Sequence, residues 1–108
     1  MVLNYETICA ISTAQGKGAV SIIRISGTEA IKICNKIFKA HRQKKISLND
    51  AKTVIIGNII ENTIIIDEVL ITIFKGPKSY TGEHIIEIAC HGSTYIQSKI
   101  IQLLIKKG

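Results

Sequence analysis

The stretch EHIIEIAC, residues 83–90, followed by TYIQSKIIQLL, residues 94–104, decides the fold. Residues 83–90 are rich in isoleucine and short, which predicts a β-strand. After Gly92 the apolar residues Ile96, Ile100, Leu103 and Leu104 recur at helical intervals, and Lys106 to Gly108 form a typical helix end. Thr94 and Gln97 have the spacing of a capping box, so we expect a strand that leads into an amphipathic helix.

Four more strands and one more helix precede this unit. Ser26 and Glu29 have the capping-box spacing, and the apolar residues that follow predict a helix over 27–39. The polar stretch His41 to Asp50 predicts a surface loop. The expected strands are residues 6–12, 19–25, 52–60 and 67–75, the first two forming a hairpin around a glycine-bearing turn. The order β-β-α-β-β-β-α predicts an α+β fold: about five strands in a mainly antiparallel or mixed sheet, with two helices packed on one face.

Length and composition describe one globular domain. The chain has 108 residues, 46% of them hydrophobic and 20% charged, with one Pro, which excludes disordered and low-complexity classes. No uncharged run approaches the roughly 20 residues that span a bilayer, and no secretory signal is visible, which favours a soluble protein of the bacterial cytoplasm. Three cysteines at no metal-like spacing favour a reducing compartment, buried thiols and no metal site.

The net charge of +6 does not by itself identify a partner. Twelve of the 14 basic residues are Lys and 25 residues are Ile, a joint excess typical of a chain-wide compositional bias. The densest basic stretch runs from Lys36 to Lys45. It fits a polyanion site or a solvated helix end and loop, and the second interpretation is favoured.

Several catalytic motifs are absent from the 108 residues. There is no Gly-x-x-x-x-Gly-Lys-Ser/Thr run for nucleotide phosphates and no Gly-x-Ser-x-Gly elbow. Cys90 and His91 are adjacent on a predicted strand, so their side chains would point to opposite faces and form no dyad. We therefore expect no catalytic residue and no enzyme activity from this chain alone.

Two charges stand inside otherwise apolar strands. Arg24 lies among isoleucines, and Glu87 lies between Ile86 and Ile88. Charges are rarely buried without partners. One interpretation is an internal salt bridge or a solvent-facing position. The other is that both face a cleft, where a carboxylate accepts paired N–H bonds from a flat heterocycle and a guanidinium holds a carboxylate or carbonyl.

The two segments that carry these charges resemble a known family. GKGAVSIIRISG (residues 16–27) and GPKSYTGEHIIEIACHG (residues 76–92), with the opening TICAISTAQGKG (residues 7–18), are similar to the N-terminal domain of the tRNA modification GTPases MnmE, also called TrmE. The similarity covers essentially the whole chain, with residues 39–66 contributing little. It implies a fold like the folate-binding domains of glycine-cleavage aminomethyltransferases, and residues 1–108 as a single folate-binding and homodimerisation domain.

The resemblance also implies cofactors and partners. The ligand would be a tetrahydrofolate derivative, 5-formyl- or 5,10-methylene-tetrahydrofolate. The full protein, with the flavoprotein MnmG, would modify C5 of the wobble uridine in certain tRNAs, without membrane involvement. GTP, Mg and K would belong to a GTPase domain that, like the family's helical domain, is not within these residues.

The family's folate-contacting arginine and glutamate fall on Arg24 and Glu87, which favours the ligand interpretation of these two charges. Tyr80 is a further candidate that could stack on the ring or anchor its loop. The glycines at 16, 18, 76 and 82 are expected to shape loops. The family's downstream lysine for folate lies beyond Gly108, so we expect weaker binding than in the full protein. The alternatives are a folate-dependent aminomethyltransferase-like fragment, which would turn over a methylene-folate, and a small basic nucleic-acid-binding module, which would bind tRNA in a salt-sensitive way.

Overall fold

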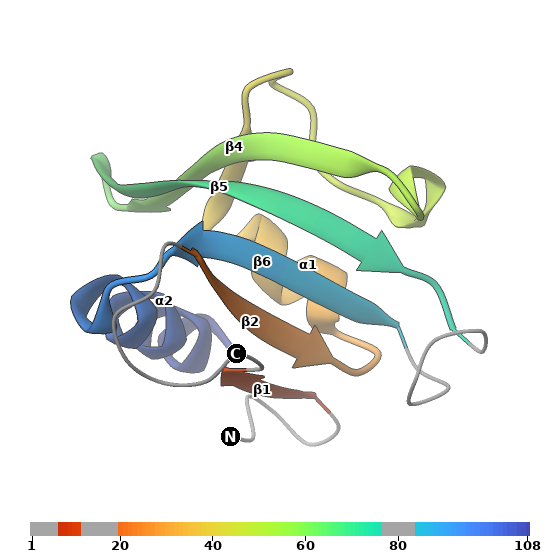
Figure 1. Ribbon diagram of the computed structural model, residues 1–108. Helices are drawn as coiled ribbons and strands as arrows, with labels where there is room; N and C mark the ends of the chain where they lie inside the picture. Colours follow the sequence, from red (N-terminus) through yellow and green to blue (C-terminus); the bar gives the residue numbers. More distant parts are fainter. Residues whose placement is uncertain (1–6, 12–19, 77–83) are drawn as a thin grey trace.

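A computed structural model of the chain describes residues 7–11, 20–76 and 84–108 (Figure 1). This part of the chain forms one sheet, two α-helices and a short 3-10 helix. The strands are β1 (Ile8–Ile11), β2 (Val20–Ser26), β3 (Phe38–Ala40), β4 (Val54–Glu61), β5 (Ile64–Phe74) and β6 (Ile85–His91). The helices are α1 (Ala30–Asn35), the 3-10 helix η1 (Leu48–Asp50) and α2 (Thr94–Lys107).

The sheet has the strand order β1-β2-β6-β5-β4-β3, and every neighbouring pair is antiparallel. Both helices lie on the same side of it (Figure 1), where α2 contacts β1, β2, β5 and β6 and α1 contacts β3, β6 and α2. The predicted α+β class with two helices is therefore confirmed. The expected antiparallel pairing of the first two strands is also confirmed, although the connection between them lies outside the described residues.

Side-chain alternation divides the sheet into a covered face and an open face. Ile23 and Ile25 of β2 pair with Ile88 and Ile86 of β6, and all four are buried in the core beneath the helices. The residues between them point away from the helices. This open face retains large exposed apolar side chains, at Ile8, Val20, Val54, Ile56 and Leu70.

The sheet has one strand more than predicted, because the helix expected over 27–39 is short. The α1 helix ends at Asn35, whose amide nitrogen donates to the carbonyl of Ile46 at 3.0 Å while its oxygen accepts from the Ile46 N–H at 3.1 Å. This side chain ties the helix end to a distant segment, and the chain turns into β3 on the edge of the sheet beside β4. Phe38 therefore packs into the core from a strand and not from a helix.

Two predicted capping boxes are wrong, and an unpredicted one is present. Ser26 belongs to β2, so α1 begins after Glu29 without a side-chain cap. The cap of α2 is Ser93 and not Thr94, since the Ser93 hydroxyl accepts from the Ile96 N–H at 3.3 Å. In the expected loop 41–50, η1 carries a complete capping box between Ser47 and Asp50. No helix in the described ranges is long and apolar enough to cross a bilayer.

Candidate functional site

Arg24 and Glu87 meet on the open face of the sheet. They stand opposite each other in the β2–β6 ladder although 63 residues separate them in the sequence. The Arg24 Nη2 lies 2.5 Å from the Glu87 Oε2, and the Arg24 Nε donates to the same oxygen at 3.1 Å. Their side chains are 34% and 21% exposed. The internal salt bridge considered from the sequence is therefore formed, at a position that solvent reaches.

The geometry of this pair leaves it able to bind a ligand. Two of the contacts from Arg24, those of Nε and Nη2, go to the same oxygen, Oε2 of Glu87. A half-buried carboxylate next to a fixed guanidinium is a strong acceptor for the paired N–H groups of a planar heterocycle. A guanidinium can contact a carbonyl or carboxylate of the same ligand.

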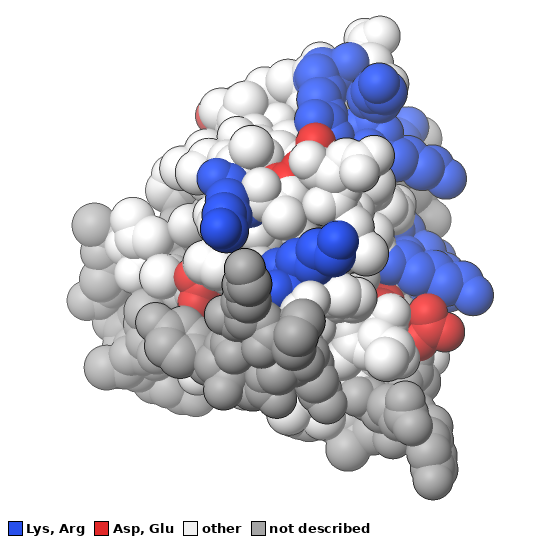
Figure 2. Space-filling model, turned by 90° about the vertical axis from the view of Figure 1, so that its right-hand side faces the viewer, with Lys and Arg blue, Asp and Glu red and all other residues white. Residues whose placement is uncertain are grey.

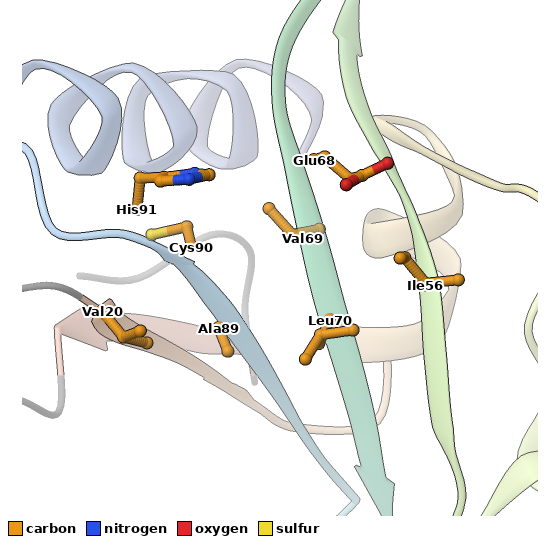
Figure 3. Close-up of a pocket in the computed structure, with 8 residues that line it drawn as sticks. All are labelled: Val20, Ile56, Glu68, Val69, Leu70, Ala89, Cys90 and His91. Carbon is orange, nitrogen blue, oxygen red and sulfur yellow. The ribbon is translucent and has the colours of Figure 1, made fainter.

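A shallow hollow lies near the pair on the open face, although neither Arg24 nor Glu87 lines it. It has a volume of about 320 Å³. Ala89 lines it and lies two residues along β6 from Glu87, so both face the same way. Figure 3 shows the polar side chains of the hollow toward one end and the apolar ones toward the other; the lining residues are Val20, Ile56, Glu68, Val69, Leu70, Ala89, Cys90 and His91. A ring that contacts Glu87 would thus have apolar surface beside it.

His91 has a buried carboxylate partner that the sequence analysis missed. Its Nδ1 lies 2.6 Å from Oδ1 of Asp67, and its backbone N–H donates to Oδ2 of Asp67 at 2.9 Å. The Asp67 side chain is only 8% exposed, whereas that of His91 is 72% exposed. The signal was present, because Asp67 is a charge inside an isoleucine-rich stretch, as Arg24 and Glu87 are.

The cysteines are structural side chains. Cys90 points into the core and His91 into solvent, which confirms that the two diverge. All three thiols are free and buried, and burial raises the pKa of Cys34 to about 12 and that of Cys90 to about 11. The pKa of Cys9 is also raised by burial. Thiolates are the reactive form, so none of the three is a nucleophile near neutral pH.

The remaining predicted positions are Tyr80 and four glycines, most of them outside the described residues. Tyr80 and the glycines at 16, 18 and 82 lie outside the described residues. The Gly76 N–H donates to Nδ1 of His84 at 3.0 Å, as expected of a residue that shapes a loop. Within the described ranges no group of His, Cys, Asp and Glu has the arrangement of a metal site.

Comparison with known proteins identifies the family. Residues 7–108 match the family model described as "GTP-binding protein TrmE N-terminus". The chain belongs to the TrmE N-terminal family. This match confirms the resemblance, and it covers the strands that carry Arg24 and Glu87.

Relatives of this TrmE N-terminal chain carry the name tRNA modification GTPase MnmE. The protein of Flavobacterium johnsoniae is 50% identical over 107 residues, which is 99% of this chain and 23% of that protein. That of Clostridioides difficile is 49% identical over 102 residues, and that of Streptococcus thermophilus 45% over 104 residues, each match covering 22% of the relative. The chain thus spans less than a quarter of the length of these curated relatives.

Proposed function

We propose that this chain is the N-terminal tetrahydrofolate-binding and homodimerisation domain of a tRNA modification GTPase. Arg24 and Glu87 contact the folate, and residues 1–108 make up one such domain. The observation that supports the proposal is the placement of this charge pair, partly exposed, on the uncovered sheet face, with a largely apolar hollow nearby on the same face.

The described residues fit a reduced folate. The pterin ring is flat and presents neighbouring N–H donors on one edge, which suit the oxygens of Glu87. Arg24 holds the glutamate in place and offers donors to the pterin carbonyl or to a carboxylate. Tyr80 is a further candidate contact. The ligand itself, 5-formyl- or 5,10-methylene-tetrahydrofolate, would supply the one-carbon unit, while this chain's residues bind and orient it.

The proposal gives the chain a binding role and no catalytic residue. GTP hydrolysis, with its Mg and K ions, belongs to the GTPase domain of the full protein. That protein acts in the bacterial cytoplasm with the flavoprotein MnmG on C5 of the wobble uridine of certain tRNAs. The open sheet face supports the dimerisation part, because exposed apolar side chains on a small domain favour self-association.

The test is a calorimetric titration of the chain with 5-formyltetrahydrofolate, comparing Glu87→Gln with Glu61→Gln. Glu61 is a matched control, since it is also held by a cation, Lys99, at 2.8 Å, but it ends β4, two strands away from β6 in the sheet. A hydrogen bond to a charged group contributes about 1.5–3 kcal/mol, so Glu87→Gln should weaken binding at least about tenfold. Glu61→Gln should bind like the unsubstituted chain.

Thermal melts of both variants check that each remains folded. Equal affinity of the Glu87→Gln variant and the unsubstituted chain would remove Glu87 from the site. Absence of binding by this chain at millimolar ligand, together with absence of binding by the full-length Flavobacterium johnsoniae relative, would refute the folate function altogether. Binding by the relative alone would assign folate binding to the full-length relative and not to these 108 residues.

A further inference from the structure

Lysines from three separate segments meet on a surface that shares no residue with the folate candidate site. One hollow of about 430 Å³ is lined by Lys39, Lys44 and Lys45, and a second of about 250 Å³ by Lys36, Lys39, Lys106 and Lys107. The two hollows share Lys39, Asn35 and Phe38, so they adjoin. We call the six lysines the lysine patch: Lys36, Lys39, Lys44, Lys45, Lys106 and Lys107, all of them exposed.

The fold, and not the sequence alone, creates this concentration of charge. Lys36 follows α1, Lys44 and Lys45 lie between β3 and η1, and Lys106 and Lys107 end α2. The ammonium of Lys36 donates to the carbonyl oxygen of Lys107 at 3.0 Å, which brings the first and last segments into contact. The sequence favoured a solvated helix end for the basic stretch 36–45, because it could not show that the end of α2 adds two further lysines.

Two acids lie near the patch, Asp50 near Lys44 and Glu61 near Lys106 and Lys107, and each makes its closest contact with a cation outside the patch. Asp50 is held by Arg42 through contacts of 2.7 and 2.8 Å, and Glu61 is held by Lys99. In the part of the chain that the structure describes, no ion pair involves a lysine of the patch. Six neighbouring ammonium groups repel one another, and a polyanion that lies across them relieves this repulsion.

The surroundings of the patch favour a nucleic-acid backbone over a lipid surface. Helices that bind membranes place exposed apolar side chains beside their lysines. None of the exposed large apolar side chains of the described residues lines either hollow. Figure 2 shows Lys and Arg side chains over the upper part of one side of the molecule, with only small areas of Asp and Glu between them.

We propose that the lysine patch binds the phosphate backbone of RNA. The choice of RNA over DNA rests on the proposed function, in which the full protein acts on tRNA. The inference that the patch binds a polyanion rests on the six lysines alone. Lysines bind phosphates as point charges and carry no sequence information, so the patch would position an RNA and not select its bases.

The experiment measures binding of a fluorescently labelled tRNA to the chain by anisotropy, from about 50 mM to about 200 mM salt. The patch variant is Lys39→Gln, Lys44→Gln and Lys45→Gln combined. The control variant is Lys32→Gln, Lys52→Gln and Lys75→Gln combined, which removes the same charge from exposed lysines outside the patch. Thermal melts establish that both remain folded.

We expect the patch variant to bind tRNA at least about tenfold more weakly, with the slope of log K against log salt smaller by about 2. The control variant should lose far less affinity for tRNA. Both variants should bind the folate as the unsubstituted chain does, so a failure of this RNA proposal can be told apart from a failure of the folate proposal. Equal losses in both variants, or no tRNA binding at the lowest salt, would overturn the proposal. The proposal would also be overturned if the chain bound vesicles of phosphatidylglycerol and phosphatidylcholine more tightly than tRNA and the patch variant lost this vesicle binding. That result would assign the patch to a lipid surface.

Discussion

At the scale of single residues, Gly57 determines how closely β3 approaches the sheet. A Cβ on Gly57 would lie 2.5 Å from Cζ of Phe38 and closer still to the carbonyl oxygen of Lys39, and neither the backbone nor a buried ring can move away cheaply. We expect Gly57→Ala to lower the free energy of unfolding by about 1–3 kcal/mol, the usual cost of overpacking. Urea denaturation of this variant and of Asn58→Ala, the next residue along β4, measures the effect. A loss no larger than that of Asn58→Ala, which should stay within about 0.5 kcal/mol, would contradict it.

The candidate site shows which single residues the sequence could identify. Arg24 and Glu87 were found because a charge among isoleucines needs a partner. That the two are partners of each other depends on the register of β2 against β6, which joins residues 63 positions apart and leaves no local trace. Asp67 is likewise a charge among isoleucines. The predicted strand 67–75 has Asp67 as its first residue, whereas β5 begins at Ile64, so the sequence did not indicate that Asp67 is buried inside a strand.

At the scale of elements, Asp50 fixes the segment between β3 and β4 by accepting from Arg42 and from the Ser47 N–H. These contacts lower the pKa of Asp50 from 3.8 to about 2. A depressed carboxyl pKa adds stability that is complete above the unfolded-state value and is lost as the pH falls through the folded-state value. The contribution of Asp50 should therefore be full above about pH 4 and disappear between about pH 4 and pH 2.

Thermal melts of the Asp50→Asn variant test this contribution. The variant should melt below the unsubstituted chain at neutral pH, and the difference should shrink as the pH falls from about 4 toward 2. Glu29→Gln is the control, because Glu29 makes no ion pair among the described residues. A difference for Asp50→Asn that stays constant down to pH 2 would show that the Arg42 contact adds nothing to stability.

The elements also show where periodicity succeeds and fails. Long apolar segments such as β4, β5, β6 and α2 were predicted correctly, because each repeats its pattern over seven or more residues. The three-residue strand β3 was assigned to a helix, since Ile37 and Phe38 continue the helical spacing of α1. The helix ends where Asn35 bonds to Ile46, and a contact between residues 11 positions apart, with β3 between them, cannot be read from local spacing.

At the scale of the whole molecule, the open face of the sheet is the surface best suited to a second copy of the chain. A stable interface buries about 800 Å² on each partner, roughly an eighth of the 6404 Å² surface of this chain. Leu70 lies in β5 on this face, opposite Ile56 of β4 and Ala89 of β6, and is 44% exposed. A two-fold interface presents every substitution twice, so Leu70→Glu would place two buried carboxylates in it.

We therefore expect the unsubstituted chain to sediment as a dimer at micromolar concentration and Leu70→Glu as a monomer. Ile105→Glu is the matched control, since Ile105 is 42% exposed but lies on α2, away from the open face. It should leave the dimer intact, because the added charge then lies on the helical side, outside the expected interface. A monomeric unsubstituted chain would refute self-association through the sheet. A dimer that survives Leu70→Glu and dissociates with Ile105→Glu would place the self-association surface on the helical side.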